Sequence, residues 1–287
     1  MAVTFRNYRS AEDIHLQNGF WMQVTRDLPW CWKPTTSPIL YSKGAQFDPR
    51  SRCFAFEGDR LVGYMSFTGQ GEFVSLGYPW VLPAYEGVLQ EELYDAVYGF
   101  AASPKYGGKR FAQRFREQWT DQVSFFKRHG FVVQRSDPIY ALDLHTANTS
   151  GVPSRFRVDC AAQFCWDDFH ALSAGRLAAQ QLSIWKEYFQ TVDFDFAVKA
   201  THNGVSVAYM GIAIRRDTGF AELVAVTVEP TAVDAIVPCL GVTVAELRSR
   251  NAVSLGTKPI PTEAAAETIM EMGFKKVSEE LLLSKDI

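Results

Sequence analysis

The sequence has few cysteines and histidines, and none at metal-binding spacing. Its five cysteines are odd in number and form no Cys-x-x-Cys motif, which argues against a disulfide framework and a cysteine-rich zinc site. The five histidines never occur four residues apart, so a His-x-x-x-His metal site on one helix is also missing. We therefore expect no bound metal.

The sequence also lacks an excess of charge of either sign. Its 29 basic and 32 acidic residues are interspersed, which argues against nucleic acid or an anionic membrane as a partner. The first nine residues carry charge where a signal peptide would be apolar, and no uncharged apolar run reaches membrane-spanning length. These features predict a cytoplasmic protein that acts on small molecules.

What the chain does have is enough apolar residues for a large core. It contains 287 residues, of which 47% are hydrophobic and 14% aromatic. A polar stretch without periodicity, residues 146–154, lies close to the midpoint. We expect it to link two domains, residues 1–148 and 154–287.

The two halves share a hairpin. Residues 52–56 and 61–67 are predicted strands joined at Gly58-Asp59, and residues 195–200 and 205–211 repeat the pattern around Asn203-Gly204. The segments Val-Gly-Tyr-Met at residue 62 and Val-Ala-Tyr-Met at residue 207 differ by an offset of 145. The match indicates an internal repeat.

Two further sequence features follow in the same order in both halves. A predicted strand ends at Pro83 in the first half and at Pro230 in the second, and a helix is predicted after each, over 88–101 and 232–247. A short strand and a second helix follow, and that helix ends at Gly130-Phe131 and at Gly273-Phe274. The shared order favours duplication, although two unrelated α/β domains with similar hairpins are the alternative.

This order of elements resembles the GNAT superfamily of acyl-CoA N-acyltransferases. The resemblance covers nearly the whole chain, as two copies. It implies an α/β fold class, with tandem domains that each hold a mostly antiparallel mixed sheet flanked by helices. In that family two strands of the sheet splay apart into a V-shaped cleft that takes the thioester and pantetheine arm of CoA.

The resemblance also implies which residues bind the cofactor. The family's pyrophosphate loop runs Arg/Gln-x-x-Gly-x-Gly/Ala after Val-x-Pro, and its glycines let the backbone approach phosphate. Here the first half keeps one glycine and has an acid at the arginine position, whereas residues 230–238 of the second half have no glycine. The candidate acetyl-CoA contacts are Val81 and Leu82 through their main chain, Glu86, Gly87, Val88, Leu89 and Gln90 in the loop, and Phe126 against pantetheine.

The candidate catalytic residues are weaker. The family often has a tyrosine five residues before the phenylalanine of Gly-Phe, but this chain has Phe126 and Ile269 at those positions. Glu72 is our candidate base, and Tyr140 our candidate acid, with Tyr78 and Tyr85 as other phenols near the expected cleft. A solvated carboxylate and packing aromatics are the alternatives for these residues.

The function implied is transfer of an acetyl group from acetyl-CoA to a primary amine of a small molecule, in the first half's cleft. The alternative is a catalytically silent GNAT-like module that binds a ligand or a protein. A homodimer is compatible with either function.

Overall fold

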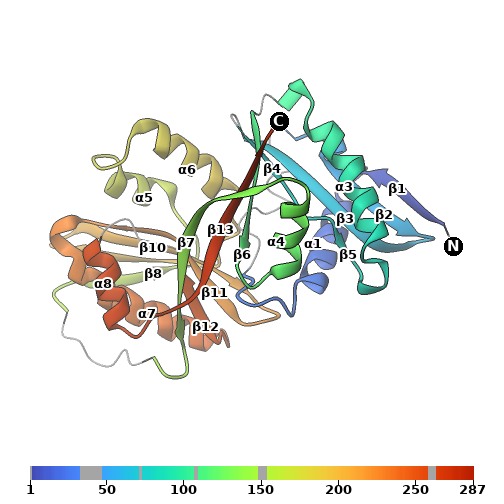
Figure 1. Ribbon diagram of the computed structural model, residues 1–287. Helices are drawn as coiled ribbons and strands as arrows, with labels where there is room; N and C mark the ends of the chain where they lie inside the picture. The colour runs from blue at the N-terminus through green and yellow to red at the C-terminus, as the bar shows by residue number, and fades with distance from the viewer. Residues whose placement is uncertain (1, 33–46, 71–72, 107–108, 148–153, 258–262) are drawn as a thin grey trace. The chain divides into compact units, whose positions relative to one another are not determined.

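A computed structural model describes residues 2–32, 47–70, 73–106, 109–147, 154–257 and 263–287. The described residues divide into two compact units, each built of strands and helices. The first unit comprises residues 2–29, 47–136 and 279–287, and the second comprises residues 30–32 and 137–278. Figure 1 shows the elements of both units.

The first unit is built on a mixed sheet in the order β1-β2-β3-β4-β6-β13, and β5 pairs with β3. The helix α3 packs on β2 and β3, and α4 contacts α3 through the rings of Phe125 and Tyr94. The strands and helices of this unit are β1 (Val3–Asn7), α1 (Glu12–Val24), η1 (Pro49–Ser51), β2 (Arg52–Glu57), β3 (Arg60–Gln70), β4 (Phe73–Leu76), β5 (Trp80–Val81), η2 (Pro83–Tyr85), α3 (Val88–Ala101), η3 (Pro104–Tyr106), β6 (Arg110–Arg116), α4 (Thr120–Arg128) and the last part of β13 (Lys275–Asp286).

The second unit repeats this plan with the order β7-β12-β11-β10-β9-β8. Strand alternation sends Met210 of β10 into a core beneath α7 and Tyr209 into a second core beneath α5 and α6. The elements are the last part of β7 (Val132–Asp143), β8 (Arg157–Ala161), α5 (Trp166–Ser173), α6 (Ala179–Thr191), β9 (Phe196–His202), β10 (Val205–Arg215), β11 (Phe220–Val228), η4 (Pro230–Ala235), α7 (Ile236–Ser249), β12 (Ser254–Thr257), α8 (Glu263–Glu271) and the first part of β13.

The C-terminal part of the last strand of each half belongs to the other half's unit. Residues Tyr140–Asp143 of β7 pair with β12 in the second unit, and residues Glu280–Asp286 of β13 pair with β6 in the first. The two compact units therefore do not divide at residues 148 and 154, because the halves of the sequence exchange the ends of their C-terminal strands. Residues 148–153 of the expected linker lie outside the described residues.

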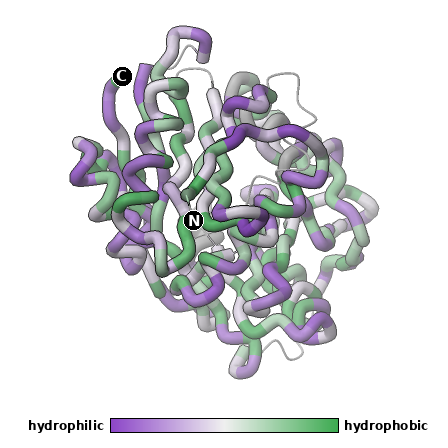
Figure 2. The backbone as a smooth tube through the Cα atoms, turned by 90° about the vertical axis from the view of Figure 1, so that its right-hand side faces the viewer, coloured by the Kyte–Doolittle hydropathy of each residue, from purple (hydrophilic) through white to green (hydrophobic). Residues whose placement is uncertain are grey.

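Both units bury one face of amphipathic elements. Figure 2 shows hydrophobic and hydrophilic residues alternating along the chain. The stretch Pro230–Ser249, which contains α7, is long and apolar enough to cross a membrane by composition alone. Its residues Ile236, Cys239, Leu240, Val244 and Leu247 are completely buried in the second unit's core, so we interpret α7 as a core helix.

Two glycines confirm the expected helix ends. Gly130 and Gly273 have φ angles of 82° and 99°, in the left-handed region that favours glycine. The amide of Phe131 donates to the carbonyl of Phe126 (3.0 Å), and that of Phe274 donates to Ile269 (3.4 Å). The same helix C-terminus thus occurs in both units.

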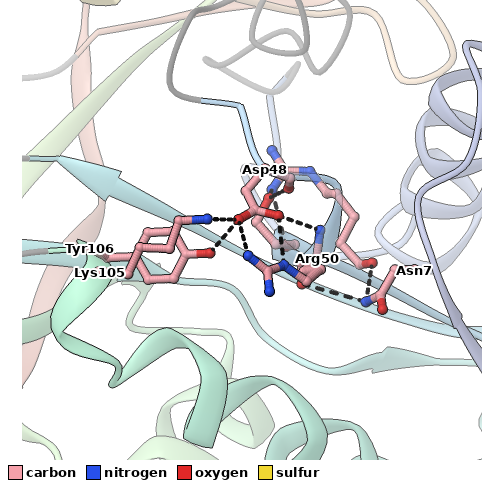
Figure 3. Close-up of polar contacts among 7 residues, drawn as sticks. Asn7, Asp48, Arg50, Lys105 and Tyr106 are labelled. Atoms are coloured by element: carbon pink, nitrogen blue, oxygen red, sulfur yellow. Dashed lines mark hydrogen bonds and ion pairs between the residues drawn. The ribbon is translucent and has the colours of Figure 1, made fainter.

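A buried carboxylate joins the start of β2 to the chain after α3 (Figure 3). Asp48 accepts hydrogen bonds from the Arg50 amide (2.9 Å), the Tyr106 hydroxyl (2.8 Å) and the ammonium of Lys105. Burial alone would raise the pKa of the Asp48 carboxyl. The hydrogen bonds from Arg50, Lys105 and Tyr106 outweigh burial and hold that pKa well below its ordinary value.

We expect Asp48→Asn to lower the free energy of unfolding by about 1–2 kcal/mol at pH 7, because its cationic partners are largely exposed. Since the folded pKa is depressed, the carboxylate stabilises the fold fully above the ordinary aspartate pKa of about 3.9 and loses this contribution as pH falls below it. Urea titrations of both proteins from pH 7 down to pH 3 check this. A difference that stays constant with pH would contradict it.

Gly211 of β10 lies directly beneath two stacked rings. Phe164 and Phe194 stack at 4.1 Å between centroids, and a Cβ on Gly211 would lie 2.6 Å from Phe194 Cε1 and 2.7 Å from Phe164 Cδ2. We expect Gly211→Ala to destabilise the second unit by about 1–3 kcal/mol, because the rings must move. The control is Gly99→Ala in α3, where a Cβ meets nothing within 4 Å and helix propensity predicts a gain of about 0.5–1 kcal/mol. Thermal unfolding of both variants measures the two effects, and equal effects would be a contradiction.

Candidate functional site

The two middle strands of the first unit's sheet separate. β4 and β6 are parallel and pair from Phe73↔Arg110 to Ser75↔Ala112, and beyond that point the chain of β4 continues as β5, which pairs with β3. At the bend a Cβ on Gly77 would lie 2.6 Å from the Ser66 carbonyl oxygen, so only glycine fits. We call the opening between β5 and the end of β6 the first splay.

The second unit has the matching strand pair. β11 and β12 are parallel and pair from Phe220↔Ser254 to Leu223↔Thr257, and β11 continues along β10 to Val228. Residues 258–262, which follow β12, lie outside the described residues. We call the side of residues 224–228 that faces away from β10 the second splay. The predicted V-shaped separation is therefore seen directly in the first unit.

The main chain of Val81 points into the first splay. The Leu82 N–H donates to the Val62 carbonyl on β3 (3.0 Å). In a strand, the N–H and C=O of one residue point to one side and those of the next residue point to the other side. Leu82, predicted as a main-chain contact, therefore uses its N–H within the sheet, whereas the N–H and C=O of Val81 face the opening. The side chains of both residues are buried.

The loop before α3 is exposed where phosphate contacts were predicted. Glu86, Gly87 and Val88 are exposed, Leu89 is buried, and Gly87 has a φ of 87°. The side chain of Gln90 folds back on this loop.

That side chain joins the loop to the first splay. The Gly87 amide donates to Gln90 Oε1 (3.0 Å), and Gln90 Nε2 donates to the Tyr78 hydroxyl (2.7 Å). One amide that a phosphate could use is thus occupied by the protein itself. Sequence reasoning placed Gln90 in the loop but gave no sign of this second bond.

Aromatic side chains gather at the first splay. The Tyr78 ring lies 4.8 Å from Trp80 and 5.4 Å from Phe125, and Trp80 lies 6.4 Å from Trp119. The Trp119 indole donates to the Pro29 carbonyl (2.7 Å). Sequence reasoning singled out neither Trp80 nor Trp119, because a lone tryptophan is commonly a packing residue.

Phe126 belongs to this aromatic cluster. It is completely buried, with ring centroids 5.3 Å from Phe115 and 4.7 Å from Phe131. Its surroundings are those of a core residue that borders the splay.

The candidate tyrosines Tyr78 and Tyr85 have different surroundings. Tyr78 lies at the first splay, where burial raises its pKa to about 12 despite the hydrogen bond from Gln90, so the phenol is protonated at neutral pH. The hydroxyl of Tyr85 donates to Glu57 on β2 (2.7 Å).

Tyr140 lies in the second unit, where it pairs with Thr257 of β12 and packs on the core beneath α7. The strand exchange is the physical reason, and the role of Tyr140 as an acid stays a prediction. Glu72, the candidate base, lies outside the described residues.

Comparison with solved structures shows which fold this is. The chain superposes on a tandem GNAT protein from the clavulanic acid biosynthesis pathway with a TM-score of 0.70 and 13% identity, covering 99% of this chain and 98% of that one. The chain has a tandem GNAT fold. A GCN5-related N-acetyltransferase from Sphaerobacter thermophilus is also similar, with a TM-score of 0.58, 12% identity and coverage of 99% and 95%.

The structure of a putative acetyltransferase from Pyrococcus horikoshii is similar as well, with a TM-score of 0.56, 13% identity and coverage of 99% and 89%. No protein-family model and no curated protein matches the sequence. Among the described residues, no group of three or more His, Cys, Asp or Glu side chains could hold a metal ion.

Proposed function

We propose that the chain transfers an acetyl group from acetyl-CoA to the primary amine of a small molecule, and that the reaction takes place in the first splay. The proposal rests mainly on Val81, whose N–H and C=O face the first splay. The exposed start of α3 follows a few residues later in the chain. Helix N-termini suit phosphate, and a strand peptide suits the amides of pantetheine. A cytoplasmic location and a homodimer remain predictions.

The chemistry requires few groups. The neutral amine attacks the thioester carbon, a C–N bond forms, the C–S bond breaks, and the nitrogen loses a proton while the CoA thiolate gains one. The Val81 amide is suited to donate to the oxygen on which charge develops. We assign protonation of the thiolate to Tyr78, because its hydroxyl oxygen accepts from Gln90 and its own O–H is left to donate.

Binding of acetyl-CoA tests the site. We expect Gly87→Trp to weaken acetyl-CoA binding at least about tenfold, because a large side chain at a φ of 87° both strains the loop and blocks its approach to phosphate. Isothermal titration calorimetry measures the effect. The matched control is Asp234→Trp at the corresponding position of the second unit, where Asp234 is exposed.

The two variants separate the outcomes. Weakening by Gly87→Trp with an unchanged Asp234→Trp protein supports the assignment. No binding by the unaltered chain, or equal weakening by both variants, would refute it.

The second candidate function is a silent GNAT-like module that binds a ligand or a protein. It is favoured by the aromatic rings at the first splay and by the Gly87 amide that Gln90 already occupies. A thiol-release screen with acetyl-CoA and amines, aminoglycosides and amino acids distinguishes the two. Turnover with any acceptor eliminates the silent module, and acetyl-CoA binding without turnover across the screen favours it.

A further inference from the structure

One corresponding hydrogen bond in each unit fixes the register between the two splayed strands. In the first unit the Leu82 amide donates to Val62, and in the second the Glu229 amide donates to Val207 (2.7 Å). Val207 corresponds to Val62 in the sequence repeat. Val228 is therefore the counterpart of Val81, and its peptide groups point into the second splay.

The Val228 carbonyl is already occupied by a side chain. Arg176, in the connection between α5 and α6, donates through Nη1 to this carbonyl and through Nη2 to the Thr227 hydroxyl (2.7 Å). The same guanidinium donates through Nε to the carbonyl of Leu172 at the end of α5 (2.9 Å). One planar cation thus fastens the C-terminal end of α5 to the end of the splayed strand.

A buried hydroxyl pair supports this arrangement. Ser173 Oγ donates to Thr227 Oγ1 (3.0 Å), and both residues are almost completely buried. Arg176 itself remains exposed, so it reaches the strand from the solvent side and is free to leave it. If Arg176 left, the carbonyls of Leu172 and Val228 and the Thr227 hydroxyl would each lose a donor.

We propose that Arg176 closes the second splay to acyl-CoA by occupying the main-chain acceptor that a pantetheine amide would use. The second unit would then keep an acyl-CoA site that is blocked by a single side chain. The loop after β11 lacks glycine and is kinked at Ala232, so a CoA phosphate contributes little there and the pantetheine contacts decide binding. This proposal concerns the second unit alone and does not depend on catalysis in the first.

Hydrogen exchange of the full chain with and without acetyl-CoA tests the proposal by location. In the unaltered chain we expect no acetyl-CoA-dependent protection of residues 224–236. In Arg176→Ala we expect protection of that segment, with acetyl-CoA binding to the second unit at least about tenfold tighter than before, since a charged donor no longer competes for the carbonyl. Protection at residues 81–92 reports separately on the first splay, so failure of the proposed function is visible independently.

Further variants exclude trivial explanations. Arg157→Ala removes the same charge from a well-exposed arginine of the same unit and is expected to leave residues 224–236 unprotected. Thr227→Val removes one acceptor without changing the shape of the side chain, and we expect a smaller gain than with Arg176→Ala. If Arg176→Ala unfolds, Arg176→Lys replaces it, because an ammonium cannot span the same acceptors.

The outcomes decide the proposal. Protection of residues 224–236 in Arg176→Ala (or Arg176→Lys) and not in the unaltered chain supports it. Protection in the unaltered chain, or none in a folded Arg176 variant, overturns it.

Discussion

Deletion of residues 279–287 is expected to unfold the first unit and to leave the second unit folded. These residues supply the strand that pairs with β6 from Glu280↔Arg116 to Asp286↔Arg110, and Leu283 within it is completely buried. Their loss leaves β6 with an unpaired edge and opens the core, a loss comparable to the whole stability of a small domain, about 5 kcal/mol or more. Hydrogen exchange of peptides 52–67 and 196–212 distinguishes the two units.

The control deletes only residues 286–287 and keeps most of the register with β6. We expect this shorter deletion to leave peptide 52–67 protected. If the longer deletion exposed peptide 196–212 and spared 52–67, the terminal strand would belong to the second unit, contrary to the exchange described above.

Glu280→Ala is expected to lower the free energy of unfolding of the first unit by about 3–5 kcal/mol. Glu280 has a side chain only 4% exposed and pairs with Arg114 (3.2 Å) and with Arg116, whose side chain is 10% exposed. Removal of the carboxylate leaves the Arg116 guanidinium buried without this partner, which costs more than the pair contributes. Denaturant titration followed by tryptophan fluorescence measures the loss.

The matched control is Glu246→Ala in α7, which removes a carboxylate from a more exposed pair with Arg250. We expect a loss of about 0.3–0.5 kcal/mol there. The double substitution Arg116→Met with Glu280→Leu should recover most of the stability, because well-packed apolar residues can replace a buried ion pair. Equal losses for Glu280→Ala and Glu246→Ala would contradict the buried pair.

Local signals in the sequence predicted the repeated scaffold well. The strand that ends at Val-x-Pro, the helix from Val88 to Ala101 and the glycine at each helix end depend on neighbouring residues, and the structure confirms all three. The hydrogen bonds from Leu82 to Val62 and from Glu229 to Val207 then show that the repeat extends to main-chain register.

The exchange of terminal strands left no such signal. The residues of β7 and β13 predict strands, but a strand pattern alone does not specify which sheet the strand joins. Tyr140, which belongs to the first half of the sequence, therefore lies in the second unit. The order of elements along the chain shows where a residue lies in the sequence, whereas strand pairing determines which unit contains it.

Local sequence patterns also did not predict which side chains contact the two splays. Gln90 contacts Tyr78 across the loop, and Arg176 comes from a connection without periodicity to reach Val228. The sequence predicted that the two halves are unequal at the cofactor loop. It did not indicate that side chains of the chain itself contact both splays.

A crystal structure of the full chain with acetyl-CoA tests the proposed site most directly. We predict the pantetheine arm in the first splay beside Val81, the phosphates at residues 86–88, the Gln90 side chain displaced from the Gly87 amide, and Arg176 still on Val228. Acetyl-CoA in the second splay alone, or a first splay unchanged in crystals grown at saturating acetyl-CoA, would contradict the assignment.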